Sequence, residues 1–119
     1  MPFGFENLDV YKKAVDFAGK IYKVTKHFPN NEVFGLTSQL KRASVSIACN
    51  IAEGSGRYYK KDFTQFLRIA RGSICECVPL LDIAVREDYI TRIIAEELTK
   101  DCNELAKMIN GLMRSLAAD

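Results

Sequence analysis

The sequence predicts an all-α protein, folded as an antiparallel up-down-up-down four-helix bundle. Apolar residues recur every three or four positions through four long segments, turn-forming residues separate these segments, and no alternation of period two is long enough for a strand. The connections are short, which favours antiparallel neighbours. A chain of 119 residues has the usual size of one domain, so we expect a single bundle over residues 1–119.

The first helix is expected from about Leu8 to about His27. Two neighbouring apolar stripes run along it: Leu8, Tyr11, Val15, Ala18, Tyr22 and Thr25; and Val10, Ala14, Phe17, Ile21, Val24 and Phe28. Together they are wider than one bundle seam requires. We therefore expect part of this face to contact another subunit.

The second helix follows the turn residues 29–31. It is expected to begin at Glu32 or Leu36 and to end at Glu53. Its core stripe is Leu36, Leu40, Ala43, Ile47 and Ile51. Gly54 stands where a left-handed C-terminal cap would require glycine.

The third helix is expected from Lys60 to Arg86, after the turn at residues 54–56. Its stripe is Phe63, Leu67, Ala70, Ile74, Cys77 and Leu81. Pro79 lies inside this pattern and cannot donate a hydrogen bond to the carbonyl of Cys75. We expect a kink there.

The fourth helix is expected from Thr91, a plausible N-cap, to Leu116, after a turn at Asp88 and Tyr89. Its stripe is Ile94, Leu98, Cys102, Leu105, Ile109, Leu112 and Leu116.

Charge and the N-terminal residues narrow the class of protein. The net charge of +2 is far from the basic excess typical of a dedicated nucleic-acid-binding protein. Residues 1–6 lack the basic run and apolar core of a secretory signal. No stretch approaches the roughly 20 apolar residues that span a bilayer. We expect a cytoplasmic protein.

The four cysteines are Cys49, Cys75, Cys77 and Cys102. A reducing cytoplasm disfavours disulfides between them. Cys75 and Cys77, the one close pair, would point about 200° apart on a helix, which does not suit zinc. We expect four small buried or half-buried side chains and no metal site.

The sequence offers no residues that we would assign to catalysis. The single histidine, His27, lies near a helix end, where a solvated imidazole favours the helix dipole. Residues 54–57, Gly-Ser-Gly-Arg, resemble a phosphate-binding loop only superficially, because they connect two helices and do not follow a strand. We expect no enzymatic activity, no cofactor and no small-molecule substrate.

A polar stripe flanks the apolar stripe of the second helix, at spacings of three and four residues. It consists of Gln39, Arg42, Ser46, Asn50 and Glu53, with Glu76 of the third helix as a candidate partner for Arg42. Ser and Asn are weak helix formers, so another role should favour them here. We favour a buried or interfacial hydrogen-bond network that sets helix register or subunit packing. A ligand or nucleic-acid groove and a solvated face are the alternatives.

A second candidate surface is basic and aromatic. Its residues lie around the expected start of the third helix and further along that helix. It consists of Arg57, Tyr58, Tyr59, Lys60, Lys61, Arg68 and Arg71. The cations can share one edge, and the tyrosines could stack on exposed bases of RNA or DNA. The alternative is a solvated basic run.

An extended signature runs through the second and third helices. Its parts are Phe28-Pro29, Glu32, residues 34–43 (FGLTSQLKRA), Ser46-Ile47, residues 50–54 (NIAEG), residues 66–70 (FLRIA), Gly72-Ser73, Glu76, Tyr89-Ile90 and a C-terminal set over residues 108–116. This signature resembles the four-helix-bundle family named for proteins encoded within intervening sequences of bacterial 23S rRNA genes. The resemblance covers nearly the whole chain.

The resemblance implies a four-helix bundle that assembles into a homo-oligomeric ring, typically a homopentamer, without known enzymatic activity. Its link to ribosomal RNA rests on gene location and is therefore associational. A related ring, the accessory protein of diversity-generating retroelements, partners a reverse transcriptase and nucleic acid. It is more basic than this chain, so that role is not carried over. An RNA- or DNA-binding accessory ring that recruits a nucleic-acid enzyme is kept as the alternative.

Two positions depart from the family pattern. Tyr59 stands where the family usually places a Ser or Thr cap, at a cost of roughly 1 kcal/mol. Pro79 falls in a helix that is continuous in the family, and an unaccommodated interior proline costs roughly 3 kcal/mol.

Overall fold

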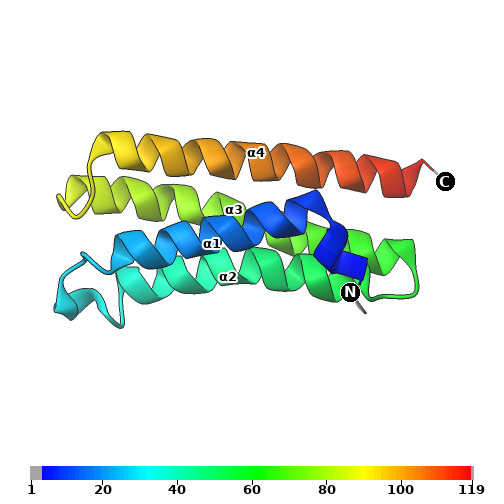
Figure 1. The fold of residues 1–119 in the computed structure, drawn as a ribbon, viewed down its shortest axis with the longest axis horizontal. Helices are drawn as coiled ribbons and strands as arrows, with labels where there is room; N and C mark the ends of the chain where they lie inside the picture. Colours follow the sequence, from blue (N-terminus) through cyan, green and yellow to red (C-terminus); the bar gives the residue numbers. More distant parts are fainter. Residues whose placement is uncertain (1–3, 119) are drawn as a thin grey trace.

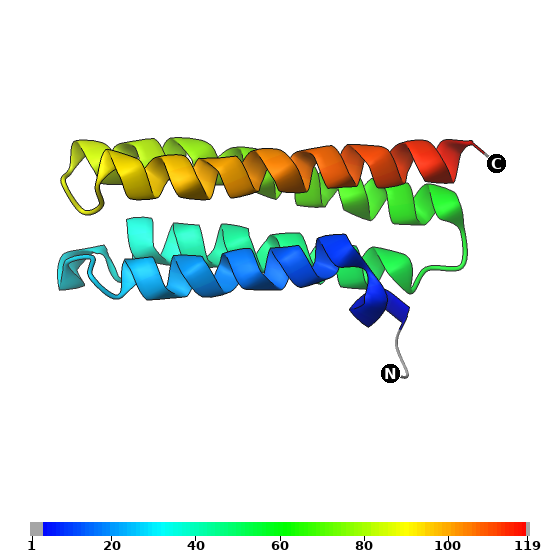
Figure 2. The ribbon, with the colours of Figure 1, turned by 45° about the horizontal axis from the view of Figure 1, so that its top comes forward.

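The computed structural model describes residues 4–118, a bundle of four long helices. Met1–Phe3, which belong to the N-terminal segment that lacks the features of a secretory signal, lie outside the described residues. The elements are η1 Gly4–Asn7, α1 Asp9–Thr25, η2 Asn30–Glu32, α2 Leu36–Ser55, α3 Lys60–Arg86 and α4 Arg92–Ala117. Consecutive helices run in opposite directions (Figures 1 and 2), which confirms the predicted all-α bundle.

The bundle measures 47 × 24 × 21 Å. The α1 helix packs against α2 and α4, and α3 packs against the same two helices. The α1–α4 and α2–α3 seams therefore lie on opposite sides of the bundle. The α2–α3 seam is the most extensive and the α1–α4 seam the least.

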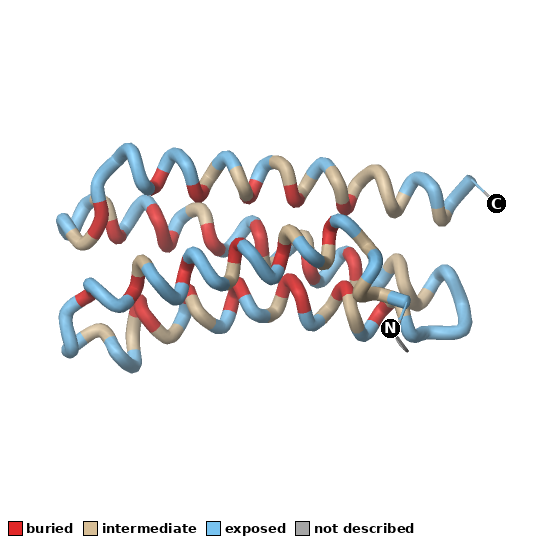
Figure 3. The backbone as a smooth tube through the Cα atoms, in the orientation of Figure 1, coloured by how far each residue is buried: buried red, intermediate tan, exposed pale blue. Residues whose placement is uncertain are grey.

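Residues of the predicted stripes form most of the core between the four helices, and Figure 3 shows buried positions recurring along each of them. On α1 the core stripe is the second one, in which Val10, Ala14, Phe17 and Ile21 are buried; Phe28, just after the helix, is buried too. Val15 and Tyr22, from the first stripe, remain exposed. The face of α1 is thus wider than its own seam, as the sequence predicted.

Gly54 does not form the predicted left-handed cap. No glycine among the described residues has a positive φ, and α2 continues through Gly54 to Ser55. A Cβ at position 54 would lie 2.7 Å from Cβ of Phe66 and 2.9 Å from Cδ1 of Phe63. Glycine is needed here because α3 approaches the α2 backbone closely.

Pro79 does not interrupt α3, which is one helix from Lys60 to Arg86. Its ring lies on the exposed side of the helix. The two N-caps agree with the sequence: Tyr59 makes no side-chain cap hydrogen bond, whereas Thr91 Oγ1 accepts one from the backbone N–H of Ile94 at 3.2 Å.

Glu32 holds the end of the bundle at which the α1–α2 loop and the α3–α4 turn meet (Figure 1). Its Oε1 accepts a hydrogen bond from the backbone N–H of Leu36 at 3.0 Å, and its Oε2 accepts one from the hydroxyl of Tyr89 at 2.9 Å. Gly35 leaves room for this carboxylate, because a Cβ there would lie 2.7 Å from Oε1. The ring of Tyr89 packs on Phe28, with centroids 5.2 Å apart.

Candidate functional site

The polar stripe of α2 meets α3 in a small hydrogen-bonded cluster. Ser46 Oγ and Ser73 Oγ are 2.9 Å apart and share a hydrogen bond. Asn50 Nδ2 donates to the backbone oxygen of Ser46 at 2.8 Å and to its hydroxyl at 3.0 Å. All three side chains are half-buried. The sequence analysis gave Ser73 only as part of the family signature and not as a partner of the polar stripe, although serine is as unexpected in α3 as Ser46 is in α2.

A cleft of about 410 Å³ opens over this cluster on the outer surface of the α2–α3 seam. Gln39, Arg42 and Glu76 line it, and all three are exposed. The predicted ion pair between Arg42 and Glu76 is absent: within residues 4–118 the two side chains share the cleft without a salt bridge. Both charges therefore face outward, available to another molecule.

Exposed apolar side chains lie on the same two helices. Val45 of α2 and Ile69 and Ile83 of α3 are exposed. A fully solvated helix face would carry long charged residues here. We call the outward surface of α2 and α3, with its polar cluster and these three apolar residues, the α2–α3 face.

Glu53, the last member of the polar stripe, belongs to a different contact. Its carboxylate pairs with Arg57 at 3.0 Å across the end of α2, and the Arg57 guanidinium lies 4.7 Å from the ring centroid of Phe66. This ion pair joins the α2–α3 connection to the end of α2. It contributes little to stability, because both charges are exposed to water.

The structure does not gather all the predicted basic residues on one edge. Arg57 turns to Glu53, and Arg71 donates to Asn110 Oδ1 of α4 at 2.8 Å. Arg68 Nη1 donates a hydrogen bond to Oε1 of Gln65 at 3.4 Å. These cations contact three different helices.

Four consecutive members of the predicted surface do stay together. Tyr58, Tyr59, Lys60 and Lys61 line a shallow cleft of about 520 Å³ with Asp62. Tyr58 is 91% exposed, and its ring meets that of Tyr59 edge-on at 4.9 Å. Exposed aromatic rings beside lysines are the groups that stack on unpaired bases.

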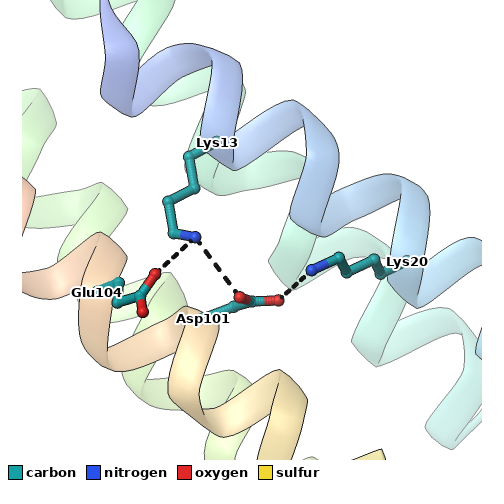
Figure 4. Close-up of polar contacts among 4 residues, drawn as sticks. All are labelled: Lys13, Lys20, Asp101 and Glu104. Carbon is teal, nitrogen blue, oxygen red and sulfur yellow. Dashed lines mark hydrogen bonds and ion pairs between the residues drawn. The ribbon is translucent and has the colours of Figure 1, made fainter.

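The α1–α4 seam carries a second set of charges, which the sequence did not reveal because the paired residues are 81 to 91 positions apart. Lys13 of α1 pairs with Glu104 at 2.8 Å and Asp101 at 3.5 Å, and Lys20 pairs with Asp101 at 2.8 Å (Figure 4). The hydrogen bond to Glu104 raises the pKa of Lys13 and lowers the pKa of Glu104. These ion pairs join α1 and α4 across the least extensive seam of the bundle.

The cysteines divide into two pairs. Cys77 and Cys102 are buried between α3 and α4, and the hydrogen bond between their thiols, with burial, raises the pKa of Cys102. Cys49 and Cys75 are exposed, so the expectation of four buried or half-buried thiols was wrong for these two. Within residues 4–118 no three His, Cys, Asp or Glu side chains lie close enough to bind a metal ion. His27 is exposed at the end of α1.

None of the helices among the described residues is long and apolar enough to cross a membrane.

Comparison with known proteins places this fold in a family. No curated protein matches the chain. The chain is similar to the crystal structure of a protein of unknown function from the S23 ribosomal protein family of Bacteroides thetaiotaomicron VPI-5482, with a TM-score of 0.80 and 28% identity over 87% of this chain and 97% of that one. A family model described as 23S rRNA-intervening sequence protein matches residues 6–111. Because this match extends over most of the chain, the protein belongs to the 23S rRNA-intervening sequence protein family.

Proposed function

We propose that this protein is a non-catalytic cytoplasmic assembly protein that forms a homo-oligomeric ring, a pentamer by its resemblance to the family. The observation that carries this proposal is the cluster of Ser46, Asn50 and Ser73 beneath the outward-facing Arg42 and Glu76. An outward-facing arginine beside exposed apolar side chains suits an interface between subunits, because arginine is enriched at interfaces and about ten hydrogen bonds cross a typical one.

A ring requires two different surfaces on each copy, one for each neighbour. The α2–α3 face and the α1–α4 seam lie on opposite sides of the bundle, so they can serve as the two surfaces. Copies would then add side by side, and the rotation between neighbours would close the ring.

The dimensions of the bundle favour this side-by-side arrangement. A specific interface buries about 800 Å² on each partner. A flank of 47 × 21 Å presents about 1,000 Å², whereas an end of 24 × 21 Å presents about 500 Å². Lateral contact therefore supplies enough area, and end-to-end contact does not.

An RNA- or DNA-binding accessory ring that recruits a nucleic-acid enzyme is the second candidate. The exposed rings of Tyr58 and Tyr59, with Lys60 and Lys61 beside them, favour it. A ring would repeat this small basic and aromatic patch once per subunit, and the copies would act together on one strand.

Light scattering on the purified protein tests assembly directly. We expect a mass several times that of the 13.4 kDa chain and a smaller species for Arg42→Glu. The control is Arg114→Glu, which makes the same change of charge at an exposed residue of α4. A wild-type protein that stays monomeric at high concentration would refute the ring.

The same samples, mixed with structured and single-stranded RNA at low and near-physiological salt, decide between the two candidates. An RNA-binding ring should lose affinity steeply with salt and with Arg57→Glu/Lys60→Glu/Lys61→Glu. The matched control is Lys26→Glu/Lys100→Glu/Lys107→Glu, which makes the same charge change elsewhere. A ring without such binding would direct the search to protein partners.

A further inference from the structure

Phe34 is the most exposed large apolar residue in the described part of the chain. Its side chain is 97% exposed, so it adds almost nothing to the packing of its own subunit. A phenylalanine of this kind can bury 150–250 Å² in a partner. Val33, beside it, is also exposed.

The segment that presents Phe34 is held in place on both sides. Before it, the short helix Asn30–Glu32 ends in the carboxylate that bonds Tyr89 and the N-terminus of α2. After it, the backbone N–H of Gly35 donates to the carbonyl of Glu32 at 2.9 Å. A backbone that is already fixed loses little conformational entropy on binding, which suits a segment that presents an interface anchor.

A cavity of about 410 Å³ lies at the same end of the bundle, between the last turn of α1 and the start of α4. Its lining is mostly apolar. Val24, Val85, Tyr89, Ile90 and Ile94 contribute the apolar part, and His27, Asp88, Thr91 and Arg92 complete it. A dry cavity of about 150 Å³ already holds a benzene molecule, so a phenyl ring fits this one with room for a neighbouring side chain.

The cavity continues along the α1–α4 seam. A second cleft, of about 330 Å³, shares Val24 and Ile94 with it and reaches Lys20 and Asp101. Phe34 lies in the loop before α2, whereas the cavity opens between α1 and α4. Because Phe34 is 97% exposed, it does not fill this cavity in its own chain. An anchor and a cavity at the same end of a rod can meet between two parallel copies.

We propose that Phe34 of one copy inserts into the cavity between Val24, Tyr89 and Ile94 of the next copy. This inference rests on the proposed ring and names the contact that holds neighbours in register. Because anchor and cavity lie at the same end, neighbouring bundles are parallel and the contact is heterologous, the kind that closes a ring by rotation.

The first test is the mass of Phe34→Ala by light scattering. We expect the ring to dissociate into smaller species while the circular dichroism spectrum is unchanged, since Phe34 does not pack in its own subunit. Tyr58→Ala removes an equally exposed ring at the other end of the bundle, and we expect it to leave the mass unchanged.

A mixing experiment tests the pairing of anchor and cavity. Ile94→Arg should block the cavity and also dissociate the ring. Phe34→Ala keeps a good cavity and Ile94→Arg keeps a good anchor, so an equimolar mixture should form a heterodimer that neither variant forms alone.

The outcomes separate this inference from the ring itself. A Phe34→Ala protein with the wild-type mass, or a mixture without heterodimer, would refute the Phe34 contact without contradicting the proposed ring. A monomeric wild-type protein would refute both the ring and the contact.

Discussion

Tyr89 donates its hydroxyl proton to Glu32 over 2.9 Å and so joins two loops that are 57 residues apart in the chain. The same carboxylate caps α2 through the backbone N–H of Leu36. One side chain therefore ends the first connection, begins a helix and fastens the α3–α4 turn.

This carboxylate should make stability depend on pH. The hydrogen bond from Leu36, and then the one from Tyr89, lowers the pKa of Glu32 below its ordinary value of 4.5. Its stabilising contribution is therefore complete above the unfolded-state pKa and is lost as pH falls through the lower folded-state pKa. We expect Glu32→Gln to have a lower melting temperature at pH 7 and a smaller further loss between pH 7 and pH 3 than the wild type.

Glu96→Gln, an exposed change on α4, is the control and should keep the wild-type pH slope. If Glu32→Gln and the wild type lose the same stability between pH 7 and pH 3, the cap contributes nothing.

Gly54→Ala should destabilise the protein, although alanine is the better helix former. The new Cβ would lie 2.7 Å from Phe66 Cβ, and such overpacking costs about 1–3 kcal/mol. Gly72→Ala, inside α3 with open space around it, should stabilise by about 0.5–1 kcal/mol. Urea unfolding measures both. Equal effects of the two substitutions would show that the helices do not approach closely at Gly54.

Substitutions at the two N-cap positions should have opposite effects on the free energy of unfolding. Thr91→Ala removes the cap on α4 and should cost about 1 kcal/mol, whereas Tyr59→Ser supplies a missing cap to α3 and should add about the same. Thr91→Ser keeps the hydroxyl and should remain near the wild type in urea unfolding. A neutral Tyr59→Ser would mean that a neighbouring group already satisfies the first turn of α3.

The Lys13–Glu104 pair should show a measurable coupling. A double-mutant cycle with Lys13→Met and Glu104→Gln should give a small favourable coupling, since the pair is partly exposed. The raised pKa of Lys13 means that this stability is complete below the unfolded-state pKa and is lost as pH rises through the folded-state value. Added salt should weaken the coupling, and a coupling that high salt leaves unchanged would argue against an electrostatic origin.

The amino-acid sequence by itself determined the four helices, most of their ends and the core stripes. These follow from local rules, because a period of 3.6 residues and nearby turn residues can be recognised without knowing the partner helix. Thr91 and Tyr59 were assigned correctly for the same reason: a cap involves neighbours three residues apart.

Only the tertiary structure decided the contacts between distant segments. It showed that Gly54 makes room for Phe66, that Ser46 meets Ser73, and that Arg42 does not pair with Glu76. These outcomes depend on how two helices are rotated about their axes and how closely they approach, and a shift of one residue would pair different side chains. The sequence contains Phe34, but its exposure depends on how the whole chain packs, which only the tertiary structure shows.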